Sequence, residues 1–210
     1  MKNINIFGIS SIFGLMSVFF YFLHVILGSM FYEDYNPLAQ AISDLTAQTS
    51  PSRNIAKIFS TFYGIFSSIF SLGFLIYFKG KINRFVTIAS IMFFSVNIIS
   101  FFGYTLFPLS ESGYAGTFQD VMHMVVTVFV VIFTIFSLIL FGVGFIRTNQ
   151  YKIIGIGSFV TLFLMMAGVI LMNLLPREYF GLAQRINIYS IIIYTGFLAL
   201  WMFKNTKKHY

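Results

Sequence analysis

Five ionisable residues in the sequence have side chains that could do chemistry: His24, Asp44, Asp120, His123 and Arg185. Histidine nitrogens and carboxylate oxygens bind divalent metal ions, and the same groups act as the general acids and bases that activate water. The planar guanidinium of an arginine instead suits a phosphate or a carboxylate. The two histidines and two aspartates are therefore candidates for catalysis or for metal binding, and the arginine is a candidate for ligand binding.

Three further polar residues join Arg185 in the predicted ligand-binding group. Arg53 and Lys57 stand at the start of a long apolar stretch, and Ser43 directly precedes one of the candidate aspartates. The cations of this group outnumber the candidate carboxylates. A net positive pocket beside lipid headgroups is expected to attract an anionic or zwitterionic lipid-like molecule more readily than a bare metal ion. The sequence identifies no cofactor.

Both aspartates also have a purely structural alternative. Asp44 could form an ion pair with Arg53 or Lys57. Asp120 follows Thr117 by three residues, and this spacing resembles a capping box at the start of a helix, with aspartate in the place of glutamate. In either case the carboxylate would hold the fold together rather than act on a ligand.

The remaining candidates have alternatives of the same kind. His123 lies three residues after Asp120, so a hydrogen bond between them could fix its tautomer, or it could be an ordinary histidine at the membrane surface. His24, the only ionisable residue well inside an apolar stretch, could be neutral and hydrogen-bonded to a serine of a neighbouring helix. Arg185 could anchor its helix at the lipid headgroups.

The elements that position these residues are predicted to be membrane-spanning helices. Of 210 residues, 58% are hydrophobic and only 9% are charged, whereas soluble domains carry about 25% charged residues. Apolar runs of the roughly 20 residues that a span needs recur along the whole chain. We predict one all-α integral membrane domain over residues 1–210, a six-helix transmembrane bundle. Its spans are expected at about 6–31, 54–78, 85–107, 119–146, 153–175 and 186–203.

The charged residues are divided between the two sides of the predicted membrane. The loops after the second and fourth spans and both ends of the chain are basic, whereas all six acidic residues fall on the other side. Positive loops stay in the cytoplasm, so we expect a multi-pass cell-membrane protein with both termini cytoplasmic. The first stretch is too long for a signal peptide and lacks its cleavage site. Nine basic residues lie on the cytoplasmic side: Lys2, Lys79, Lys81, Arg84, Arg147, Lys152, Lys204, Lys207 and Lys208.

Small and polar residues recur in several spans at steps of three and four, which places them on one helix face. Such a face packs on other helices, because small side chains let helices approach closely. These stripes are expected to turn the five candidates inward near the outer membrane surface, around one polar cavity. The stripe of the first span consists of Ser10, Gly14, Ser17, Tyr21, His24 and Gly28.

The loop after the first span carries a helix signal of its own. Asn36 followed by Pro37 is a favourable helix start, and apolar residues then recur at helical spacing. We predict a short amphipathic helix over residues 37–48 that lies at the membrane interface.

This same segment carries a family resemblance. Residues 36–45, with the sequence NPLAQAISDL, resemble the N-P-x-x-x-x-I-S-D/E-L signature of a prokaryotic membrane protein family catalogued as domain of unknown function 998. The resemblance extends to Phe107-Pro108, to His123 and to residues 181–186, GLAQRI, which are similar to the family's G-L-x-E-R pattern. Gln184 stands where glutamate is common, which removes a carboxylate beside Arg185. The resemblance implies a six-helix fold and supplies no activity.

Three functions are compatible with these observations. The first is binding or transport, in which an outward-facing polar cavity holds a lipid-like or small anionic ligand. The second is a membrane-embedded hydrolase that acts on a lipid headgroup or an amide through an Asp/His site, although no H-E-x-x-H or G-x-S-x-G motif is present. The third is an accessory or structural membrane subunit. The lipid bilayer is the expected partner, and the scattered charges leave no surface for nucleic acid.

Overall fold

Six long helices make up the fold. The computed structural model describes residues 6–206, and within that range it contains α-helices and short 3-10 helices but no strand. Each of the six is long and apolar enough to cross a membrane, which confirms the predicted all-α, six-helix class. The helices are α1 (Ile6–Met30), α2 (Arg53–Phe78), α3 (Arg84–Leu106), α4 (Phe118–Ile146), α5 (Lys152–Leu174) and α6 (Phe180–Thr206).

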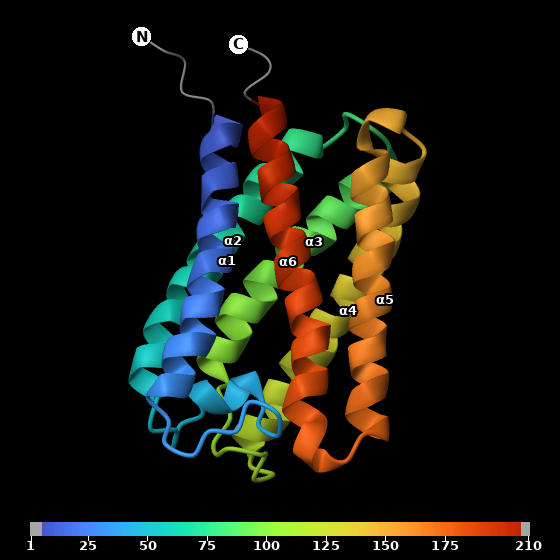
Figure 1. Cartoon of the computed structure of the whole chain (residues 1–210). Helices are drawn as coiled ribbons and strands as arrows, with labels where there is room; N and C mark the ends of the chain where they lie inside the picture. The colour runs from blue at the N-terminus through green and yellow to red at the C-terminus, as the bar shows by residue number, and fades with distance from the viewer. Residues whose placement is uncertain (1–5, 207–210) are drawn as a thin grey trace.

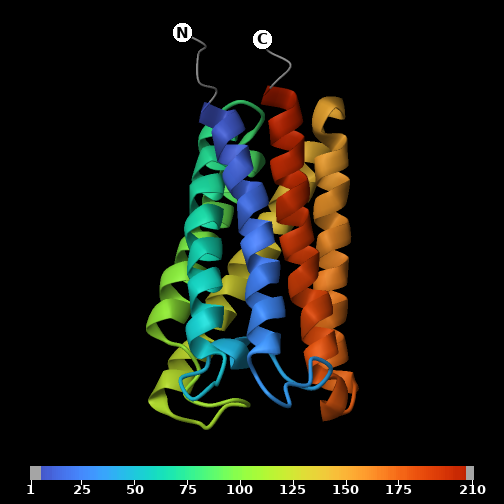
Figure 2. The same ribbon diagram turned by 60° about the vertical axis from the view of Figure 1, so that its left-hand side comes forward.

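The helices are arranged as a ring in chain order. Each helix packs against the next one along the chain, and α6 returns to pack against α1. Figures 1 and 2 show that α1 begins and α6 ends at the same end of the bundle, which we call the terminal end. The opposite end carries the connection between α1 and α2. We call this connection, residues 31–52, the strap, and this end of the bundle the strap end.

The strap contains less helix than the sequence predicts. Instead of an α-helix over 37–48, it forms a tight turn followed by the 3-10 helix η1 (Ile42–Thr46). The Asn36 side chain accepts a hydrogen bond from the backbone of Leu38, and its backbone N–H donates to the Gln40 side chain. These bonds satisfy the local backbone in a turn, as asparagine side chains often do, so a longer helix does not start.

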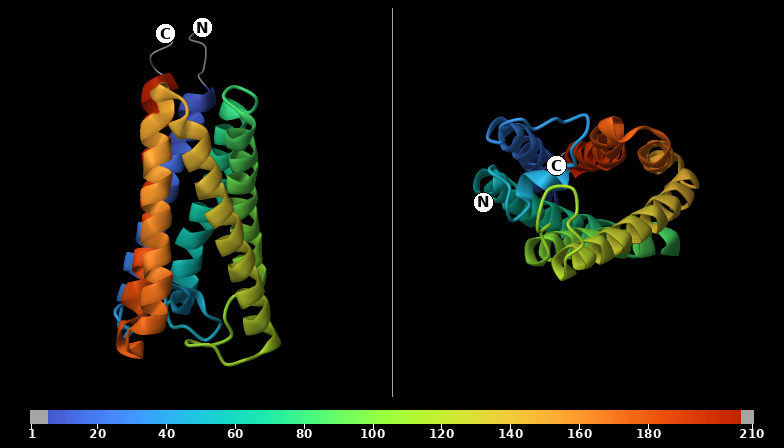
Figure 3. Two further views of the ribbon diagram at one scale, coloured as in Figure 1. Left: turned by 90° about the vertical axis from the view of Figure 1, so that its right-hand side faces the viewer. Right: turned by 90° about the horizontal axis from the view of Figure 1, so that it is seen from below.

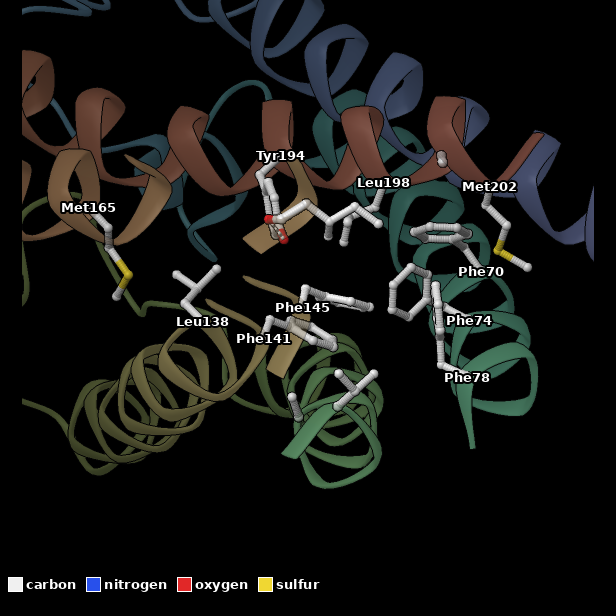
Figure 4. Packing of buried hydrophobic residues seen from close by; sticks show 14 residues of the cluster. Phe70, Phe74, Phe78, Leu138, Phe141, Phe145, Met165, Tyr194, Leu198 and Met202 are labelled. Atoms are coloured by element: carbon white, nitrogen blue, oxygen red, sulfur yellow. Dashed lines mark hydrogen bonds between the residues drawn. The ribbon is translucent and has the colours of Figure 1, made fainter. Parts of the chain in front are cut away.

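The core at the terminal end is built from aromatic rings. Figure 4 shows phenylalanines of α2 and α4 packed against residues of α6. Phe74 lies 4.7 Å from Phe78 and 5.6 Å from Phe141, ring centroid to ring centroid. Close helix contact is possible here because small residues face the neighbouring helices, as the stripes predict. A Cβ added to Gly14, for example, would collide with Ala199 and Phe70.

Candidate functional site

The strap runs across one side of the strap end, from α1 toward α6 and back to α2, as the view from below in Figure 3 shows. It is tied to α6 by a hydrogen bond from the Leu182 N–H to the Leu38 carbonyl, 2.9 Å long. It is also tied to the loop between α3 and α4, because the Gln48 N–H donates to the Leu109 carbonyl at 2.8 Å. Its apolar residues, including the fully buried Leu45, pack against α1 and α2. The strap is therefore a docked layer of the structure rather than a free loop.

Arg185 is the main tie between the strap and α6. Its buried guanidinium donates to the carbonyls of Pro37 and Gln40 in the strap and to that of Gly181 in its own helix. A further bond, 2.8 Å long, runs to the hydroxyl of Tyr35. The side chain predicted to hold an anionic ligand is thus engaged with the protein's own oxygens. Its ligand role remains a prediction, and it would have to coexist with these four bonds.

Gln184 adds a second side-chain hydrogen bond between α6 and the strap. Its side-chain oxygen accepts a hydrogen bond of 2.8 Å from the Ile42 N–H at the start of η1. At Gly181, a Cβ would collide with the carbonyls of Gln40 and Pro37, so the strap lies directly on the α6 backbone. Residues 181–186, which resemble the family's G-L-x-E-R pattern, are therefore the surface on which the strap docks. The docked part of the strap is residues 36–45, which resemble the family's N-P-x-x-x-x-I-S-D/E-L signature.

The position of Tyr35 in the strap changes the pKa of its hydroxyl. Burial raises the pKa of the Tyr35 hydroxyl, and the neighbouring Arg185 guanidinium partly offsets this by favouring the ionised form. The hydroxyl therefore stays protonated at neutral pH, where it accepts the hydrogen bond from Arg185.

Asp44 joins the strap to the loop between α3 and α4. One carboxylate oxygen accepts from the Ala41 N–H at 3.0 Å and caps η1, and the other accepts from the Gly113 N–H at 3.2 Å. Its partners are thus backbone groups rather than Arg53 or Lys57. Such charge-assisted bonds to N–H groups are among the stronger hydrogen bonds in proteins.

Asp120 fixes the same loop from the α4 side. Its fully buried carboxylate accepts from the backbone and hydroxyl of Ser110 and from the backbone N–H groups of Ala115 and Thr117. Thr117 in turn accepts from the Asp120 N–H, which forms the capping box that the sequence spacing resembles. Four donors occupy the carboxylate, so its observed role is to fold the loop.

His123 is oriented by a backbone carbonyl. Its Nδ1–H donates to the Phe107 carbonyl at 2.8 Å, so this bond, and not one to Asp120, fixes the tautomer. The imidazole packs against the Tyr104 ring at 4.8 Å between centroids, and the Tyr104 hydroxyl donates to Thr127 at 3.2 Å. In the neutral tautomer this leaves Nε2 as a hydrogen-bond acceptor.

His24 differs from every other candidate. Only 6% of it is exposed, and both of its ring nitrogens are buried without a hydrogen-bond partner among the described residues. The serine partner that a structural explanation requires is thus not found in residues 6–206. The nearest ring is that of Tyr21, one turn earlier on α1, at 5.9 Å between centroids.

Several tyrosines gather around His24 in the strap half of the ring. The Tyr21 ring lies 5.0 Å from that of Tyr63 on α2 and 6.3 Å from that of Tyr189 on α6. We call His24, Tyr21, Tyr63 and Tyr189 the tyrosine–histidine cluster. It brings together neutral hydrogen-bonding side chains of α1, α2 and α6.

The sequence reasoning missed most of this cluster. It placed Tyr21 on the inward stripe but did not name it, Tyr63 or Tyr189 among the candidate site residues. The available signal was that Tyr21 and His24 share a helix face at a spacing of three. The stripe of α1 on which both lie is buried throughout, as expected.

The other predicted ligand-binding residues, Arg53, Lys57 and Ser43, do not take part in the ring contacts of the tyrosine–histidine cluster. Lys57 is exposed on α2, where it helps line a shallow surface hollow of about 350 Å³ together with Asn54 and Thr61. Arg53 is half-buried at the first residue of α2, and Ser43 is half-buried in η1. Across residues 6–206, no three histidine or acidic side chains come together as a metal site would require.

Comparison with known proteins identifies the chain's relatives only at the level of a family. A family model described as "Protein of unknown function (DUF998)" matches residues 15–201. Neither the search of curated proteins nor the search of solved structures gave a match.

Proposed function

The chain belongs to this membrane protein family of unknown function, and we propose that it binds a lipid-like ligand whose polar head is held by His24 and the tyrosine–histidine cluster. The ligand is either stored at this site or carried across the membrane.

The proposal rests on the unpartnered imidazole of His24. A polar group buried without a hydrogen bond costs several kcal/mol in an apolar environment, roughly 2–7 depending on the reference state. A structure keeps such a group when something else supplies the missing partner. Neutral imidazole offers one donor and one acceptor, and each phenol hydroxyl offers both. A head group with hydroxyl, carbonyl, amide or phosphate oxygens satisfies these groups.

The surroundings favour a head group with negative or partly negative oxygens. Arg185 lies one helical turn before Tyr189 of the cluster on α6, and its guanidinium is positively charged at all physiological pH values. No acidic side chain belongs to the cluster. An anionic or zwitterionic lipid therefore fits the charge better than a cationic one.

The alternative functions have less support. A hydrolase needs a carboxylate or a metal ion free to activate water, but Asp44 and Asp120 already accept bonds from loop backbone groups. An accessory subunit explains the ties between loops but gives no reason for the unpaired nitrogens of His24. Lipid binding accounts for both observations.

We also propose that the strap end faces the outside of the cell and that both termini are cytoplasmic. The basis is the sequence distribution of nine basic residues, of which six lie in the described residues on the terminal side and three, Lys2, Lys207 and Lys208, lie outside the described residues. In this orientation the tyrosine–histidine cluster lies in the outer half of the membrane.

Native mass spectrometry of the purified protein tests ligand binding. The wild-type chain is expected to retain a bound lipid, and His24→Leu is expected to lose it, because leucine fills a similar volume without hydrogen bonds. Glu111→Ala, a change on the exposed loop between α3 and α4, is the matched control and should retain the lipid. A wild-type protein without lipid, or a lipid indifferent to His24→Leu, would favour the accessory-subunit alternative.

A further inference from the structure

The six contacts between neighbouring helices are not equally tight in the strap half of the ring. Five of them are closed there by rings or by glycines so near the next helix that a Cβ would collide. These contacts are Tyr21–Tyr63 for α1 and α2, Gly64–Phe101 for α2 and α3, Gly103–Val126 for α3 and α4, Gly168–Asn187 for α5 and α6, and Phe22–Tyr189 for α6 and α1.

The sixth contact, between α4 and α5, is tight in the terminal half, and Figure 3 (left) shows the two helices diverging from there toward the strap end. There a Cβ on Gly142 would meet the Phe159 ring, and one on Gly155 would meet the backbone of Ile146. Leu138 of α4 and Met165 of α5 belong to the same buried cluster, as Figure 4 shows.

The exposed fraction of side chains on one side of α4 increases toward the strap end. Phe145 and Leu138 on this face are 0% and 4% exposed, respectively. Val131 and Ile135 continue this side of α4 and are half-buried against the same cluster, whereas Met124, nearer the strap end, is 46% exposed. Val128, farther round the helix, is 53% exposed. Cover on this side of α4 therefore decreases toward the strap end.

On the facing side of α5, Met166 and Ile170 in the strap half are 37% and 53% exposed, and Phe159 in the terminal half is 38% exposed. Figure 3 (left) looks straight at these two helices and shows them diverging toward the strap end. Because both belong to the membrane-spanning set, the uncovered faces lie within the apolar part of the bilayer.

On the side of the strap end, Ile42 and Leu45 of the strap pack in one buried cluster with Tyr21. The strap is held there by Arg185, by Gln184 and by the backbone bond from Leu182 to Leu38. A molecule that reached His24 from water would have to displace this layer. A molecule already dissolved in the bilayer meets the diverging helices directly.

We infer that the ligand of the proposed site is a bilayer lipid that enters sideways between the strap halves of α4 and α5 and leaves its hydrocarbon tail there. This inference rests on the proposed function and adds the route and the position of the tail. The faces of Met124, Val128, Met166 and Ile170 are wholly apolar, which suits an acyl or isoprenoid chain. Two of the four are methionines, whose flexible side chains adapt to a chain of variable shape. The polar head then points toward the tyrosine–histidine cluster.

Cross-linking the two helices tests the route, since the chain has no native cysteine. In the double variant Met124→Cys with Met166→Cys, a long bis-maleimide bridges the uncovered faces of α4 and α5. The matched control, Leu164→Cys with Ile193→Cys, bridges α5 and α6 across an apolar surface groove of about 410 Å³ that both residues line. Each purified protein is incubated with vesicles of phosphatidylglycerol and phosphatidylcholine that carry deuterated acyl chains. Native mass spectrometry then follows the replacement of the bound lipid.

We expect the bridge between α4 and α5 to abolish lipid exchange over a time in which the unbridged double variant exchanges completely. The control bridge should leave exchange unchanged. Exchange at the unbridged rate after bridging α4 to α5 overturns the sideways route but leaves lipid binding intact. Absence of any bound lipid from the unbridged proteins overturns both proposals, so the two failures can be told apart.

Discussion

Removing the guanidinium of Arg185 is expected to release the strap from α6. In the wild-type chain this group bonds to the Pro37 and Gln40 carbonyls and to the Tyr35 hydroxyl. A hydrogen bond to a charged group contributes about 1.5–3 kcal/mol. Since such terms do not add fully, Arg185→Ala should weaken strap docking by about 3 kcal/mol. Because the helices keep their own contacts, the opening should be local.

Hydrogen–deuterium exchange of the strap measures this change directly. A loss of about 3 kcal/mol corresponds to exchange about 150 times faster, because each 1.4 kcal/mol is a factor of ten. The reporter groups are the backbone N–H groups of Ile42 and Leu182, which bond between the strap and α6. Amides in the middle of α2 should keep their protection.

Two further variants test whether faster strap exchange comes from loss of the Arg185 guanidinium rather than from general destabilisation of the protein. Arg177→Ala removes an exposed arginine of the short helix before α6 and should leave strap exchange unchanged. Gly181→Ala keeps the guanidinium but places a Cβ against the Gln40 and Pro37 carbonyls, so it should also speed exchange. Unchanged strap protection in Arg185→Ala, or an equal effect of Arg177→Ala, would refute the assignment of Arg185 as the tie.

Two other predictions follow from the loops. Cysteines introduced at Lys81 and at Glu111 should react with a membrane-impermeant maleimide from opposite sides, with only the cysteine at Glu111 labelled in intact cells; labelling of both in intact cells contradicts the proposed orientation. Asp120→Asn should lower the free energy of unfolding by about 2 kcal/mol or more, because an amide offers one acceptor oxygen to donors that now share two. Thermal unfolding in detergent measures this, and an unchanged midpoint would contradict the role of Asp120 as the loop's anchor.

The helices could be predicted because the membrane imposes a simple rule on sequence. Each span must be a continuous apolar run, so the ends of α1, α2 and α3 fall close to where the runs end. The capping box at Thr117 and Asp120 was visible for a similar reason, since both partners lie within one turn. By contrast, α6 begins at Phe180 rather than near residue 186, because its first turns carry the polar residues that dock the strap.

The ties between loops could not be predicted, because their partners are far apart in the sequence. The bond from Arg185 to Pro37 joins residues separated by 148 positions, and that from Gln184 to Ile42 spans 142. In each case the acceptor or the donor is a backbone group, whose availability depends on the turn that the strap adopts. Residue type and spacing therefore drew attention to the charged residues without revealing what they bind.

The proposed ligand site lies apart from the charged residues for a physical reason. A charged group beside or within a bilayer is tolerated where protein dipoles surround it, and backbone groups of interhelical loops are the dipoles nearest to the helix ends. Asp44, Asp120 and Arg185 all satisfy this requirement, and each thereby fixes a loop. A neutral imidazole costs less to bury than a charge, so the fold can leave the hydrogen bonds of His24 to a ligand. The group best suited to receive a ligand is therefore the weakly polar residue that the fold leaves unsatisfied, rather than the most highly charged one.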